Sequence, residues 1–214
     1  IPVVLIAGIL WSFGPLVVRH IDQPELVPWQ YLLGRGVTIF LILNLYLFFE
    51  EGINFYKNYK RIGWSGLIGG IGLAIAMISF IWSITNTSAA VTLLCLAAMP
   101  FITAFLGFMF LNERISINVW ISIVLASVGI CIIALGNFSA GTLFGLVFGL
   151  ASAIGFSIFS VSLRWRKETP TFTTVALAGL FCAIVSIIIL VETDKSLISS
   201  SKNQGLFSVH GTIV

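Results

Sequence analysis

The 214-residue chain is 58% hydrophobic and only 9% charged, with a formal net charge of +3 at pH 7. A bilayer core of about 30 Å needs roughly 20 apolar residues per helix, and this composition excludes a soluble globular domain in favour of an integral membrane protein. The Lys and Arg residues lie at the ends of apolar segments and not on one patch, which excludes a nucleic-acid-binding protein.

Apolar segments of about bilayer length follow one another along the chain, separated by short polar joints. They are residues 2–18, 28–49, 63–85, 89–111, 117–135, 142–163 and 172–191. Because a backbone in lipid must pair its polar groups internally, each segment is expected to be a helix, and all are too long for barrel strands. A polar joint at 192–204 and an apolar stretch at 205–214 predict the start of a further span. The predicted fold is an all-α polytopic helix bundle with seven full transmembrane helices and a truncated eighth.

The distribution of Lys and Arg among the joints predicts the orientation of the chain. Cytoplasmic loops are enriched in these residues, so we expect a multi-pass protein of the plasma or inner membrane with a cytoplasmic N-terminus. The joints then predicted to be cytoplasmic carry Lys57, Lys60, Arg61, Arg114, Arg164, Arg166 and Lys167, whereas the outer joints carry Arg19, Lys195 and Lys202.

Two prolines lie inside apolar segments, Pro15 in the first and Pro100 in the fourth. Each removes a backbone hydrogen bond and is expected to kink its helix. Broken helices near the bilayer midplane are a feature of transporter binding sites. Proline is also common in membrane helices generally, so the pattern favours a transporter without requiring one.

A faint internal repeat relates the first span to the sixth. Residues 11–19 align with residues 156–164, since both begin with an aromatic residue and serine and both end in arginine; residues 28–40 then align with 170–182. Five spans separate the two copies, so the second copy enters the membrane with the opposite orientation. Such inverted repeats are typical of secondary transporters.

The fourth span carries a more specific resemblance. It reads Thr87-Ser88-Ala89-Ala90, then Leu93-Leu94 and Met99-Pro100-Phe101, and it ends in Phe110-Leu111-Asn112-Glu113-Arg114. This pattern resembles the EamA-type transporters of the drug/metabolite transporter superfamily, and Trp11-Ser12, Arg35 and Gly129 also match that family. The resemblance implies ten helices built as two inverted five-helix repeats around a central substrate cavity. Residues 1–136 would form the first repeat, and residues 141–214 would form an incomplete second one.

Arg35 is the strongest candidate for a site residue, because an ionisable group inside a membrane span is costly to bury. It would attract a carboxylate or phosphate if it faces the cavity, or it would extend to the interface if it does not. Aromatic and small polar residues that would line an outward-opening cavity are Trp11, Ser12, Ser79, Phe80, Trp82 and Asn86. Packing of these side chains, with Trp82 as an interface anchor, is an equally good interpretation.

The sequence gives no support for an enzyme, a cofactor or a metal site. It lacks HExxH, a pair of intramembrane aspartates and a glycine-rich phosphate loop. Glu113 and Arg114 are expected to form a local pair at the end of the fourth span. We therefore expect a secondary transporter of a small organic metabolite working by alternating access, with the lipid bilayer as its other partner and a homodimer left open. The alternative is a non-transporting membrane component that packs against partner helices.

Overall fold

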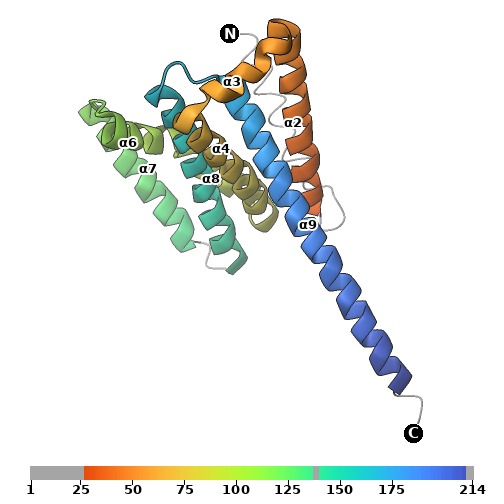
Figure 1. The fold of residues 1–214 in the computed structure, drawn as a ribbon. Coiled ribbons are helices and arrows are strands. Elements are labelled where there is room, and N and C mark those ends of the chain that lie inside the picture. The colour runs from red at the N-terminus through yellow and green to blue at the C-terminus, as the bar shows by residue number, and fades with distance from the viewer. Residues whose placement is uncertain (1–26, 137–139, 211–214) are drawn as a thin grey trace.

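The computed structural model describes residues 27–136 and 140–210, and every regular element within those ranges is a helix (Figure 1). The first predicted span lies outside the described residues, and so do Trp11, Ser12 and Pro15. The helices in chain order are α2 (Val27–Glu51), the 3-10 helix η1 (Gly52–Phe55), α3 (Tyr56–Arg61), α4 (Gly63–Asn86), α5 (Ala89–Ala97), α6 (Met99–Leu111), α7 (Ile117–Gly136), α8 (Ala140–Trp165) and α9 (Thr171–His210).

Five stretches of the described chain are helical, long enough and apolar enough to cross a membrane, which confirms the corresponding predicted spans. They are Pro28–Arg61, Gly63–Asn86, Ala89–Leu111, Leu143–Trp165 and Thr171–Thr193. Helix α7 has 20 residues and occupies the position of the predicted fifth span. The total of seven full spans and a truncated eighth stays a prediction.

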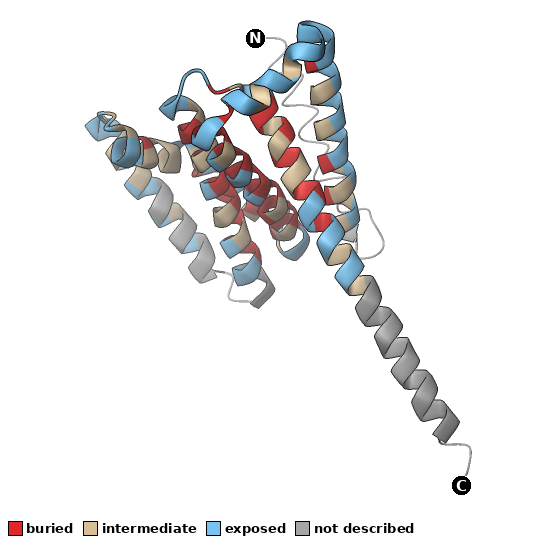
Figure 2. Ribbon diagram, in the orientation of Figure 1, coloured by how far each residue is buried: buried red, intermediate tan, exposed pale blue. Residues whose placement is uncertain are grey.

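Helices α4 and α8 form the centre of the bundle, with α2 and α9 on one side and α6 and α7 on the other (Figure 1). Buried residues concentrate on α4, on α8 and on the faces that pack against them (Figure 2). The two central helices touch through their backbones at one crossing, because a Cβ on Gly155 would lie only 2.6 Å from the carbonyl oxygen of Gly72. In lipid, where apolar burial gives little drive for association, such close approach maximises van der Waals contact.

A second glycine crossing joins α2 to α9. A Cβ on Gly36 would lie 2.6 Å from the carbonyl oxygen of Gly179, and a Cβ on Gly179 would lie 2.8 Å from that of Gly36. Next to this crossing, the Cys182 thiol donates to the Leu32 carbonyl over 3.7 Å. The α4–α8 pair and the α2–α9 pair are therefore held in the same way, by a backbone contact that no larger residue permits.

The contacts between helices give their directions, which alternate from one span to the next along the chain, as successive membrane spans must. Gly69 lies against Ser162 while Ser83 donates to the Gly145 carbonyl, so α4 and α8 are antiparallel. Ser65 is hydrogen-bonded to Thr169 and Gly70 contacts Leu177, so α4 and α9 are parallel.

The predicted fourth span is divided in the structure. Helix α5 ends at Ala97 and α6 begins at Met99, with Pro100 in the first turn of α6. Proline has no N–H to donate back along the helix, and it is well tolerated only in such a first turn. The Ser157 hydroxyl of α8 donates to the Ala153 carbonyl over 2.8 Å and also lies 3.1 Å from the Met99 carbonyl at the break.

Helix α9 differs from the sequence prediction at its C-terminal half. The polar joint expected at residues 192–204 is helical, and α9 continues without interruption to His210 (Figure 1). At 1.5 Å per residue its 40 residues extend about 60 Å, roughly twice the bilayer core. The joint contains neither Gly nor Pro, so its polarity marks where the chain leaves lipid and not where the helix ends.

Candidate functional site

Trp82 lies in an aromatic cluster at the end of α4. Its ring meets Trp29 of α2 edge-on at a centroid distance of 5.7 Å, and it lies 6.3 Å from Phe144 and 6.2 Å from Phe148 of α8. Edge-to-face pairs at such distances contribute about 0.5–1.5 kcal/mol each beyond the area they bury. The cluster thus joins three helices by packing.

The other predicted residues of α4 do not converge on one space. Phe80 is 4% exposed and belongs to the hydrophobic core, and Ser79 is equally buried. Asn86 is exposed at the end of the helix, where its side-chain amide donates to the Trp82 carbonyl over 2.8 Å. The structure therefore distributes these residues between the core and a helix end.

Arg35 is half-buried on α2, immediately before the Gly36 crossing with α9. Eight residues separate it from the start of the helix at Val27, which corresponds to about 12 Å along the axis. The Cα atom of Arg35 therefore lies more than two helical turns inside the span. Its position agrees both with a binding role and with a side chain that extends toward the nearer interface.

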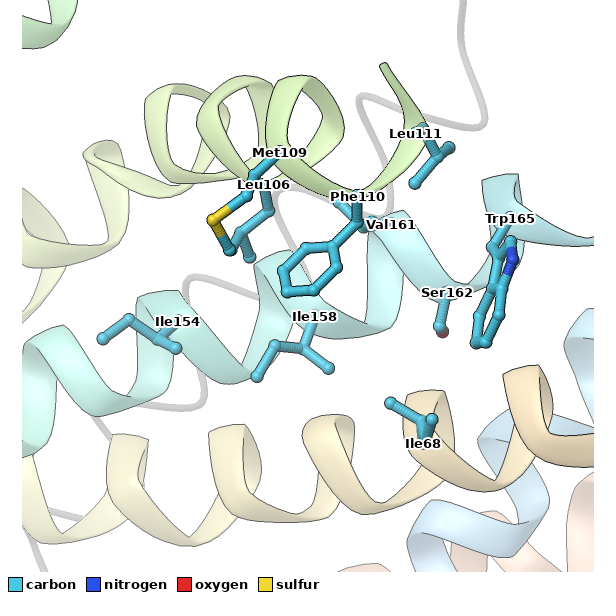
Figure 3. A pocket seen from close by; sticks show the side chains of 10 residues that line it. All are labelled: Ile68, Leu106, Met109, Phe110, Leu111, Ile154, Ile158, Val161, Ser162 and Trp165. Carbon is cyan, nitrogen blue, oxygen red and sulfur yellow. The ribbon is translucent and has the colours of Figure 1, made fainter. Parts of the chain in front are cut away.

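An apolar cavity of about 630 Å³ lies between α4, α6 and α8 (Figure 3), and none of the predicted site residues that the structure describes lines it. A volume of this size is typical of small-molecule sites. Figure 3 shows Phe110 extending from α6 toward α8 across the space. The lining residues are Ile68, Leu106, Met109, Phe110, Leu111, Ile154, Ile158, Val161, Ser162 and Trp165.

The chemistry of this cavity is almost entirely hydrophobic. Ser162 contributes a hydroxyl, and that hydroxyl already donates to the Phe159 carbonyl over 2.8 Å. The lining can therefore hold an apolar body by van der Waals contact, with the serine oxygen free to accept one hydrogen bond. Sequence reasoning missed this cavity because uniformly apolar spans do not reveal which faces meet.

Charged groups lie at one edge of the cavity. Arg164 Nη1 donates to Glu113 Oε2 over 2.9 Å, and Arg164 Nη2 lies 3.4 Å from the Thr103 carbonyl of α6. The sequence predicts a local pair between Glu113 and Arg114, but in the described chain Glu113 pairs with Arg164. The turn after α6 directs the Glu113 carboxylate toward α8. At that turn Asn112 adopts a left-handed φ of 53°, and the Glu113 N–H donates back to the Gly107 carbonyl.

Buried hydroxyl groups connect α4 with α5 and with α8. The Ser83 hydroxyl is shared with Thr92 of α5 over 2.8 Å and donates to the Gly145 carbonyl of α8 over 2.7 Å. Ser152 of α8 donates to the Ala76 carbonyl of α4 over 2.9 Å. Such interhelical bonds stabilise packing inside a membrane by about 0.6 kcal/mol on average.

Apolar helices of alternating direction, one of them interrupted and flanking an apolar cavity, define a polytopic α-helical membrane protein in contact with the lipid bilayer. The model of the EamA-like transporter family matches residues 1–135. The chain therefore belongs to the EamA-like transporter family.

Two curated proteins are similar to this chain. An uncharacterized transporter of Helicobacter pylori strain J99 is 24% identical over 184 residues, covering 85% of this chain and 60% of that protein. The uncharacterized transporter YoaV of Bacillus subtilis strain 168 is 24% identical over 132 residues, covering 59% of this chain and 44% of that protein. The chain thus spans about half the length of the curated relatives it matches. No solved structure gives a significant match.

Proposed function

We propose that this chain is part of a secondary transporter that moves a small organic metabolite by alternating access, with residues 1–136 and 141–214 belonging to two inverted repeats. The observation that carries the proposal is the origin of the cavity walls. Helices α4 and α6 come from the first proposed repeat, and α8 comes from the second. Substrate sites of inverted-repeat transporters lie at the interface between repeats, next to discontinuous helices.

The chemistry of the lining favours a substrate with an apolar or aromatic body. Hydrophobic pockets hold such bodies by contact, and a few polar groups orient the ligand. Arg35 remains our candidate for attracting an anionic group. Trp11, Ser12, Ser79, Phe80, Trp82 and Asn86 remain candidates for lining a cavity that opens outward. We place the joints rich in Lys and Arg in the cytoplasm, and with them the N-terminus.

The test is a panel of small organic metabolites offered to proteoliposomes that contain the protein. We expect uptake or release of at least one compound, and we expect Leu106→Trp on α6 to reduce that flux because the larger side chain fills the cavity. The matched control is Ile121→Trp on α7, where the side chain is 52% exposed and does not line the cavity. Absence of flux across the panel would favour the alternative, a membrane component that packs with partner helices.

A further inference from the structure

The ion pair between Arg164 and Glu113 lies next to one end of the cavity lining. Arg164 directly precedes Trp165 of α8, and Glu113 follows Leu111 of α6 by two residues; Trp165 and Leu111 both line the cavity. The pair therefore joins the two helices that form opposite walls, on the side that also carries the basic joint Arg164–Glu168. Both side chains are exposed, so the pair connects the two helices at the surface of the described chain and not within the core.

The local backbone is shaped to accept this pair. The guanidinium contacts both the Glu113 carboxylate and the Thr103 carbonyl, so it ties the turn after α6 and the helix itself to α8. Gly107 makes room for it, because a Cβ there would lie 2.6 Å from Glu113 Oε2 and 3.1 Å from Arg164 Nη2. A Cβ at position 107 would displace the ends of both charged side chains from the positions in which they pair.

Two properties of the surroundings allow the connection to open. The side chains of Arg164 and Glu113 are 42% and 40% exposed, and ion pairs with that exposure are weak enough to break readily. Helix α6 meets α5 at the single turn residue Ala98, where Pro100 removes a backbone hydrogen bond, so α6 can tilt about this point. A weak ion pair that holds the short helix α6 can therefore form in one arrangement of the helices and break in another.

We propose that the Arg164–Glu113 pair is a latch that keeps α6 against α8 and closes the mouth of the cavity on the side of the basic joints. The role of this latch rests on the proposed transport function, but opening and closing of the cavity can be measured without a substrate. When the pair breaks, α6 moves away from α8 and water reaches the cavity wall from that side. Gly107 is the positioning residue that lets the pair form.

The test uses a cysteine at Val161, which lines the cavity and is only 7% exposed. The full chain carrying V161C is placed in sealed vesicles of each orientation and treated with a membrane-impermeant maleimide, and each variant is compared with the same variant lacking V161C. We expect slow labelling with the native pair and a rise of roughly two- to fivefold in E113Q and R164Q, as the strength of a partly exposed ion pair implies. The rise should occur from the basic-joint side.

Three further variants make the result decisive. The exchange E113R/R164E should restore slow labelling, whereas G107A should raise labelling with both charges intact. E168Q removes a carboxylate at the same end of the bundle and should leave labelling unchanged, because Glu168 is 3.9 Å from Arg166 and does not reach Arg164. Fast labelling with the native pair, or equal labelling in all variants, would overturn the latch. Absence of metabolite flux with the expected labelling pattern would instead refute the transport function alone.

Discussion

Replacing Gly155 with alanine tests whether backbone contact between α4 and α8 holds the bundle together. The new Cβ would lie 2.6 Å from the Gly72 carbonyl oxygen and 2.8 Å from the Ala76 nitrogen. Both are backbone atoms, so no side chain can rotate away to relieve the contact. The first distance must lengthen to the ordinary contact limit of 3.4 Å, which separates the helices by about 0.8 Å at the crossing.

The cost of that separation follows from the short range of dispersion forces. A gap of 0.5–1 Å forfeits about a quarter to a half of the attraction between the atoms involved. Overpacking of a close-packed interface typically costs about 1–3 kcal/mol, and we expect G155A to lose stability in that range. Equilibrium unfolding in mixed detergent micelles, followed by the loss of helical circular dichroism, measures the change.

Gly34→Ala is the matched control, because a Cβ at that position of α2 meets nothing within 4 Å. Alanine favours helix over glycine by about 1 kcal/mol at either position, so the difference between the two variants isolates the packing cost. We expect G34A to be as stable as the native protein or slightly more stable. Equal free energies of unfolding for G155A and G34A would refute the backbone-contact argument.

Three other substitutions test separate parts of the structure. Arg35→Leu should abolish transport without affecting membrane insertion, and unchanged uptake kinetics would remove Arg35 from the candidate site. Ser83→Ala should lower the free energy of unfolding by about 1 kcal/mol, because it removes the hydroxyl bond with Thr92 and the bond to the Gly145 carbonyl. The same micelle assay measures this loss, and a loss no greater than that of G34A would contradict the prediction. Pro100→Ala should restore the missing backbone donor and straighten the span formed by α5 and α6. The distance between spin labels on these two helices should then increase. An unchanged distance would show that something other than proline causes the break.

Helix positions were predicted well wherever a long apolar run met a polar or glycine-containing joint. The predicted span at 63–85 matches α4, and that at 117–135 matches α7, within one residue at each end. These boundaries are clear because membrane depth limits both the length and the polarity of a span. The extension of α9 was missed because polarity reports the edge of the lipid, whereas helix termination requires a local signal such as Gly or Pro.

The candidate site was less predictable than the fold. In a uniformly apolar helix the residues facing lipid, core and cavity have the same composition, so Ile154 of the cavity and Ala153 of the core have no distinguishing mark in the sequence. Pairing was equally hidden, because Glu113 meets Arg164, 51 residues away, and not the adjacent Arg114. Arg35 was identifiable because a charge in an apolar span is conspicuous on its own.

The Gly36–Gly179 crossing has a geometric consequence within the inverted repeat that we propose. Helices α2 and α9 are the second helices of the two copies, and aligning residues 28–40 with 170–182 brings Gly36 opposite Ala178, one residue before Gly179. A contact between equivalent helices lies on the pseudo-two-fold axis that interchanges the copies. An inward-facing and an outward-facing state are exchanged by that rotation, but points on the axis map onto themselves. The crossing would therefore be a fixed pivot common to both states, around which the remaining helices tilt.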